Sequence, residues 1–105
     1  MQFRGGMSEL MRQASRLQRK IEQTKAELKD KTVEVSGAND QVKVTANYGR
    51  ELVRVTIDPA LMESDRELAL DAVVATANAA LHQAGEAMDK ELEKATGGLK
   101  IPGII

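Results

Sequence analysis

Side chains that carry out chemistry are present in this chain, but their spacing predicts no catalytic or metal site. His82 is the only histidine, and of the residues four positions away, Asn78 and Glu86, only Glu86 could assist it as a weak ligand. Because a zinc site usually needs about three or more protein ligands, we interpret His82 as a solvated surface residue. The chain contains no cysteine, which excludes disulfides and thiolate-bound metals.

The other residues that could act in catalysis or phosphate binding also lack the partners that such chemistry needs. No serine has a neighbouring general base, and the carboxylates of residues 65–96 are scattered as on a solvated helix face. Gly5-Gly6 and Gly97-Gly98 match neither the P-loop nor the dinucleotide fingerprint. We therefore expect a protein that is not an enzyme and needs no cofactor, metal or small-molecule substrate.

One cluster of charged residues does indicate a binding function. At about 100° per residue, four basic side chains fall within an arc of about 100° on one helix face. These are Arg12, Arg16, Arg19 and Lys20, with Glu9 as the only acid on the arc. Arginine suits phosphate because its planar fork is always charged and can bind two oxygens. The alternative is an ordinary solvated flank of a coiled coil, which fits the same four residues.

The distribution of charge and the shortage of aromatic residues narrow the kind of nucleic acid that such a face could hold. The net charge is −1, yet residues 1–31 hold eight Lys/Arg and four Asp/Glu, whereas residues 58–96 hold three and nine. Aromatic residues make up only 2% of the chain, so there is little for unpaired bases to stack on. Any bound nucleic acid should be duplex, held through its phosphates with little base readout.

Two long helices are expected to carry these residues, one on each side of a short sheet. Over residues 7–31, steps of three and four alternate along a heptad seam. Its members are Met7, Leu10, Ala14, Leu17, Ile21, Thr24 and Leu28. The second helix should cover residues 65–96, with Ser64 and Glu67 as a capping box and Gly97-Gly98 as its end. Residues 1–6 are expected to form a mobile leader, and residues 97–105 an apolar tail.

Between the helices, residues 32–58 are predicted to form three short antiparallel strands. Residues 32–35, 41–46 and 52–57 alternate apolar and polar side chains with a period of two. One face would hold Val33, Val35, Val42, Val44, Ala46, Val53, Val55 and Ile57. Residues 37–40 and 47–50 have the composition of turns, because glycine and asparagine tolerate positive φ. Asp58-Pro59 should end the sheet.

These lengths predict a single α+β domain over residues 1–105. Six-residue strands span ~20 Å, whereas the helices span ~36 and ~46 Å, so the helices must extend past the sheet. We expect both to leave the sheet at one end, which would bring Lys90 and Lys94 towards Arg4 and Arg12. Because three strands bury a small core and leave exposed edges, we expect a homodimer that merges two sheets.

No segment of the sequence resembles a membrane span or a secretory signal. No apolar run approaches the ~18 residues of a spanning helix. The first six residues contain no apolar signal-peptide core. The default expectation is therefore a cytoplasmic protein.

The whole layout resembles the YbaB/EbfC family of bacterial nucleoid-associated proteins. The similar segments are Gly5-Gly6-Met7 followed by residues 10–14, Val42-Lys43-Val44-Thr45, residues 53–59, residues 71–80 and residues 97–103. The resemblance covers nearly the full chain in order, and the strand that ends in Ile57-Asp58-Pro59, with the Ala/Asn-rich helix after it, is its most specific part.

This resemblance implies a tweezer-shaped homodimer of α-β-β-β-α protomers that binds duplex DNA with its projecting helices. It implies a place in the nucleoid, with effects on nucleoid organisation and gene expression. The family's DNA contacts lie on the helical arms. Carried over to this sequence they are Arg12, Arg16, Arg19 and Lys20 on the first helix, with Arg4 before them, and Lys90 and Lys94 on the second.

Two other functions fit the same layout. A helix–strands–helix protomer is also similar to a prefoldin-like chaperone arm or an adaptor module, in which Met7, Met11 and the apolar tail would grip protein partners. A purely structural dimer without a ligand is the third interpretation. Deleting residues 97–105 should abolish partner binding under the chaperone interpretation and lower DNA affinity only slightly under the DNA-binding one.

Overall fold

The computed structural model describes residues 2–98, with side chains from residue 6 onward. Its elements follow in the order α1 (Gln2–Leu28), β1 (Thr32–Gly37), β2 (Val42–Asn47), β3 (Leu52–Ile57), α2 (Pro59–Ser64) and α3 (Arg66–Ala95). The predicted fold class is confirmed, with long helices flanking a three-stranded antiparallel sheet. The predicted tail beyond Gly98 lies outside the described residues.

The first helix is longer at its start and shorter at its end than the sequence pattern predicts. It begins at Gln2 rather than at Met7, so most of the predicted leader is helical. It ends at Leu28, whose carbonyl accepts a hydrogen bond of 3.0 Å from the backbone N–H of Lys31. The β-branched residues Thr32 and Val33 then start the sheet, as their strand propensity favours.

The three strands pair in the order β1-β2-β3, and the predicted apolar face is present except at Val53, since Ala46 pairs with Leu52 instead. Val35 pairs with Val44, and Val44 with Val55, so these valines lie on the same side of the sheet. An irregularity between Thr45 and Ala46 breaks the β2–β3 register. This common face is the one that the helical layer covers.

The turns use positive φ at residues other than the predicted glycines. Positive φ occurs at Ala38, Asn39 and Asp40 in the first turn and at Arg50, with φ 63°, in the second. Gly37 serves a different purpose, because a Cβ there would collide with the side chain of Thr76 on α3. The glycine is needed for the close approach of β1 to the helix rather than for the turn itself.

The start of α3 is capped by a residue other than the predicted one. Asp65 is the N-cap, and its Oδ1 accepts a hydrogen bond of 3.0 Å from the backbone N–H of Leu68. Ser64 instead closes the short helix α2, where its Oγ donates to the carbonyl of Leu61 at 3.4 Å. The predicted capping box is therefore wrong, because a six-residue helix that starts at Pro59 already includes Ser64.

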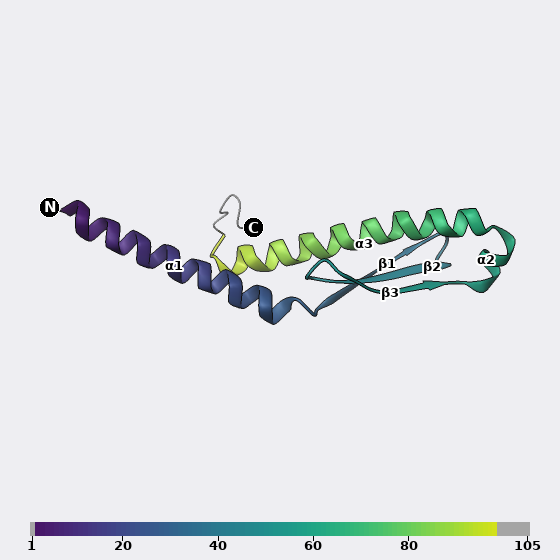
Figure 1. The fold of residues 1–105 in the computed structure, drawn as a ribbon, viewed down its shortest axis with the longest axis horizontal. Coiled ribbons are helices and arrows are strands. Elements are labelled where there is room, and N and C mark those ends of the chain that lie inside the picture. Colours follow the sequence, from purple (N-terminus) through teal and green to yellow (C-terminus); the bar gives the residue numbers. More distant parts are fainter. Residues whose placement is uncertain (1, 99–105) are drawn as a thin grey trace.

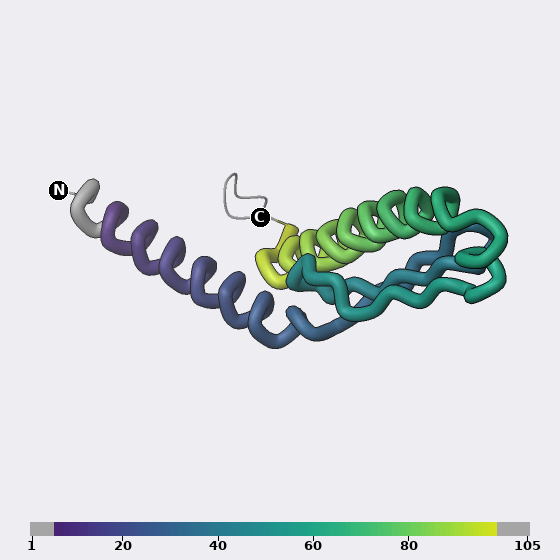
Figure 2. The backbone as a smooth tube through the Cα atoms, turned by 45° about the vertical axis from the view of Figure 1, so that its right-hand side comes forward, coloured from purple at the N-terminus to yellow at the C-terminus, as the bar shows by residue number. Residues whose placement is uncertain are grey.

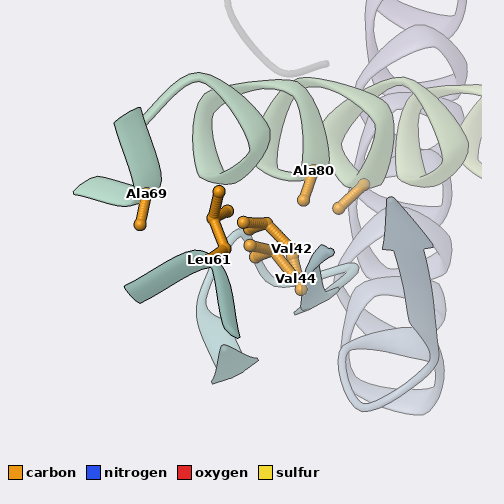
Figure 3. Packing of buried hydrophobic residues seen from close by; sticks show 7 residues of the cluster. Val42, Val44, Leu61, Ala69 and Ala80 are labelled. Atoms are coloured by element: carbon orange, nitrogen blue, oxygen red, sulfur yellow. The ribbon is translucent and has the colours of Figure 1, made fainter. Parts of the chain in front are cut away.

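The main core lies between α3 and the sheet. Val42 and Val44 of β2 point towards Ala80 of α3, and Leu61 of α2 closes the end of the same layer (Figure 3). The α3 side of this core is mostly alanine, so the helix backbone can approach the sheet closely. The covering helix lies over β1 and β2 and makes little contact with β3.

A second, smaller core joins the two long helices. Ile21 of α1 packs against Met88 and Leu92 of α3, with Leu17 and Leu28 beside them. The contact between the two helices is short because α3 starts at the end of the sheet far from α1 and runs back over it (Figure 1). The expectation that both helices leave the sheet at one end is wrong, since α3 mostly covers the sheet and only its last turns reach α1 (Figure 2).

Candidate nucleic-acid interface

The N-terminal half of α1 projects from the molecule as a single helix (Figures 1 and 2). The molecule measures 75 × 20 × 16 Å, with a radius of gyration of 20.0 Å, whereas a compact domain of this size has about 13 Å. Ile21 is 1% exposed, whereas Leu10 of the same apolar seam is 63% exposed. The seam is therefore packed only in its second half, and we call residues 6–16 the free arm.

The four basic residues predicted on α1 lie on one exposed face, which runs from the free arm to the junction with α3. Their side chains are all exposed. Arg12 forms an ion pair of 3.2 Å with Glu9, one turn earlier, and both partners are largely solvent-accessible. An exposed pair of this kind contributes at most ~1 kcal/mol, so it leaves Arg12 able to exchange its partner for a phosphate. We call Arg12, Arg16, Arg19 and Lys20 the basic face.

Of the other predicted contacts, Lys90 and Lys94 do not join this face. The α1 backbone passes through Arg4, but its side chain lies outside the described residues. Lys94 pairs with Glu91 at 3.5 Å. Lys90 and Lys94 flank Leu92, which packs against Ile21, and Arg12 lies nine residues before Ile21, or about 14 Å along the helix. The predicted approach of these lysines to Arg12 is thus wrong.

The structure brings together a second group of cations that the sequence analysis did not single out. Lys25 and Lys29 at the end of α1 and Arg50 in the β2–β3 turn line one pocket of about 460 Å³. Sequence reasoning missed Arg50 because its turn was assigned to Gly49 and Asn47. In the sequence, Arg50 is only an arginine that follows a glycine in a hairpin turn. Its place in a pocket becomes clear once the structure brings α1 and α3 beside that turn.

His82 is placed as the sequence predicts, on an exposed stretch of α3. Its Nε2 lies 3.0 Å from a carboxylate oxygen of Glu86, one turn away. Across the described part of the chain, no three histidine or acidic side chains gather as a metal site would require. Nor is any helix in that part long and apolar enough to cross a bilayer. The basic face remains the principal candidate for a function.

Comparison with known proteins gives one family match and several similar relatives. The model of the YbaB/EbfC DNA-binding family matches residues 3–99. A nucleoid-associated protein of Moorella thermoacetica is 40% identical over 100 residues, which cover 94% of this chain and 96% of that protein. One from Anaeromyxobacter dehalogenans is 42% identical over 96 residues, covering 90% and 93% of the two chains. One from a Thermoanaerobacter strain is 40% identical over 105 residues, covering 97% and 95%.

Proposed function

Because this chain belongs to the YbaB/EbfC DNA-binding family, we propose that it binds duplex DNA through the basic face of α1 with little sequence preference. Arg12 and Lys20, the two ends of the basic face, are eight residues apart, or about 12 Å along the helix axis. Over that length a DNA duplex carries about seven phosphate charges, at one per ~1.7 Å. Four cations on one side of a rod can therefore replace counterions without reading a base.

The observation that carries this proposal is the exposure of the basic face on a helix that leaves the body of the molecule. Arg16, Arg19 and Lys20 project from the outer side of α1, opposite the seam that packs on α3. A free helical arm can approach a phosphate backbone without collision from the sheet layer. The carboxylates at the start of α3, Glu67 and Asp71, lie at the end of the sheet far from α1, so salt screens their repulsion of DNA on the free arm.

The same proposal includes a homodimer. β3 is an edge strand, and its apolar side chains Val53 and Val55 are 56% and 42% exposed. Val55 shares a face with the buried Val44, so this apolar layer stops abruptly at the third strand. A second copy that covers β3 would complete the layer and remove the exposed edge. Such a dimer would carry two basic arms, and thus two contacts with DNA.

With two arms, the protein would hold separate points on one duplex or bring two duplexes together. The relatives described above are named nucleoid-associated proteins. We place this chain in the bacterial nucleoid within the cytoplasm, where it would organise the chromosome and thereby affect gene expression. Non-specific phosphate contacts suit this role, because such a protein must bind many sequences.

The decisive experiment measures binding to a short duplex at several salt concentrations by fluorescence anisotropy. Wild type is compared with an Arg12→Ala/Arg16→Ala/Arg19→Ala/Lys20→Ala variant. The logarithm of the association constant falls with log salt by about 0.9 per phosphate contact. If each of these residues holds one phosphate, the variant should lose affinity and about three to four units of slope.

A charge-matched control separates this face from a general effect of net charge. Arg16→Ala/Arg19→Ala should weaken binding, whereas Lys43→Ala/Arg54→Ala, which removes two exposed cations from the sheet, should change it little. Equal losses in the two double variants would show that the basic face is not the site. Absence of duplex binding near physiological salt would refute the proposal as a whole.

The protein-interaction function remains the second candidate because of one observation. Met7, Leu10 and Met11 on the free arm are all largely exposed. Exposed apolar side chains at an arm tip are suited to gripping a protein chain. Replacing Leu10 and Met11 by serine should leave the salt-dependent DNA affinity nearly unchanged. A large loss of DNA affinity in this variant would assign the apolar side of the arm to DNA binding.

A further inference from the structure

The pocket between the end of α1, the β2–β3 turn and α3 combines cations with an apolar floor. Of its lining residues, we call the buried Met88 and Leu92 the floor, the half-buried Tyr48 a wall, and the exposed Lys29 and Arg50 the rim. Its volume of about 460 Å³ lies within the ~300–1,000 Å³ of small-molecule sites. Apolar surface with a few convergent charged groups is the usual composition of such sites.

The walls of this pocket are fixed by hydrogen bonds between distant parts of the chain. The backbone N–H of Tyr48 donates to the carbonyl of Lys31 at 2.8 Å, and that of Gly49 donates to the carbonyl of Lys29 at 3.2 Å. These bonds join the hairpin turn to the end of α1. The ammonium of Lys31 lies 5.9 Å from the centre of the Tyr48 ring, which steadies that wall.

Arg50 is held in place by its surroundings. Its backbone has a φ of 63°, a region that a residue with a side chain rarely adopts. Its guanidinium lies against the backbone of Gly85 on α3, where an added Cβ would lie 2.8 Å from Nε and 2.9 Å from Cζ. Asp89 approaches Nη2 at only 3.8 Å, a loose ion pair. The arginine is thus positioned over the pocket with a weak partner.

This pocket is separate from the basic face. At about 100° per residue, Lys25 and Lys29 lie roughly 150° around α1 from the centre of the basic face, on the far side of the apolar seam. A duplex resting along the basic face of one protomer could not reach them. The apolar floor offers no hydrogen bond or charge to a phosphate backbone, but it can pack against a ring system.

We propose that this pocket binds a free nucleotide, with the base on Tyr48, Met88 and Leu92 and the phosphates at Lys29 and Arg50. A nucleotide joins an aromatic body to an anionic end, which is the chemistry that the floor and the rim combine. Asp89 competes with the phosphates for Arg50 and repels them. The proposal is for reversible binding of the nucleotide and includes no chemical step on it.

The test titrates the full-length protein with N-methylanthraniloyl-ADP, a fluorescent ADP, and competes it with ADP, adenosine and pyrophosphate. ADP should displace the probe at lower concentration than adenosine or pyrophosphate, because each of these lacks one half of the ligand. Arg50→Ala should weaken binding about tenfold, as loss of a hydrogen bond to a charged group does. Asp89→Asn should strengthen binding severalfold, an opposite change that general destabilisation would not produce.

Gly85→Ala gives a variant that keeps every charge. Alanine favours a helix interior over glycine, so the fold should be retained, as a thermal melt would verify. The new methyl group would displace the Arg50 guanidinium, and probe affinity should fall several-fold. Unchanged affinity in both Arg50→Ala and Gly85→Ala, or no probe binding at millimolar concentration, would overturn the proposal.

The outcome can be separated from that of DNA binding. Arg16→Ala/Arg19→Ala should keep the affinity for the fluorescent ADP while it loses affinity for duplex DNA. If this double variant loses the probe as well, the nucleotide sits on the basic face and the pocket is not its site. Failure of DNA binding in every variant would leave the ADP titration fully interpretable.

Discussion

Single residues decide where the elements of this protein start and how closely they approach. The carboxylate of Asp65 accepts the backbone N–H of Leu68 and caps α3, whereas the neighbouring Ser64 belongs to α2. We expect Asp65→Ala to lower the free energy of unfolding by about 1 kcal/mol, because an N-cap acceptor is lost. Ser64→Ala should cost clearly less, and urea denaturation of both variants measures the difference. Equal losses of unfolding free energy in the two variants would contradict the assignment of Asp65 as the only cap of α3.

At this scale the sequence predicts where a helix cap or a turn lies better than it predicts which residue forms it. The motif Ser64–Glu67 fits a capping box, but the adjacent Asp65 can also be an N-cap. Because Ser64 ends the short helix α2, Asp65 takes the N-cap position of α3. Likewise the turn after β2 was identified correctly, while its positive φ falls on Arg50 and not on Gly49. The contact of Arg50 with Gly85 on α3 is a tertiary one, which a single sequence does not display.

The junction between α1 and α3 is the element-scale feature that positions the arm. Ile21 is almost fully buried between the two helices, whereas Leu10 on the same seam is exposed. Ile21→Ala should destabilise the protein by about 2–4 kcal/mol, since it leaves a cavity. Leu10→Ala should change the unfolding free energy by less than about 0.5 kcal/mol. A comparable loss in both variants would mean that the free arm is packed in solution.

Hydrogen exchange of α1 amides should follow the same division. Residues 8–16 make few tertiary contacts, and an isolated helical stretch of that length is marginal in water. Without DNA, their amides should exchange faster than those of residues 18–28, which lie beside α3. Saturation with duplex DNA should slow exchange in the free arm. Uniform protection along α1 before DNA is added would contradict this gradient.

The heptad seam shows what periodicity can and cannot predict. Steps of three and four correctly identified α1 and its apolar side. They did not indicate that only Leu17, Ile21 and Leu28 would meet α3, because the packing depends on the direction in which α3 crosses the sheet. The strand pattern is more informative, since the register confirms the common apolar face for every predicted member except Val53, where the β2–β3 register shifts. Nothing in that pattern showed that α3 would leave β3 uncovered.

The uncovered third strand is the feature that concerns the whole molecule. If a second copy covers it, a charge placed there should separate the subunits, because a buried unpaired carboxylate is costly. We expect Val55→Glu to be monomeric by light scattering at micromolar concentration, whereas wild type is dimeric. For comparison, Val74→Glu introduces the same charge at an exposed valine of α3, and its oligomeric state is measured in the same way. A monomeric wild type at that concentration would reject the dimer.

The single attachment of α1 makes the free arm a lever. The helix is clamped near Ile21, and Met7 lies fourteen residues further out, or about 21 Å along the axis. A tilt of about 10° at the clamp would therefore move the tip by about 4 Å, with no change within the helix. In the proposed homodimer, two such arms would adjust their spacing to the width of the duplex between them. The packing of Ile21 against Met88 and Leu92 would then set how stiffly the arm is held, although none of these three residues contacts DNA in this proposal.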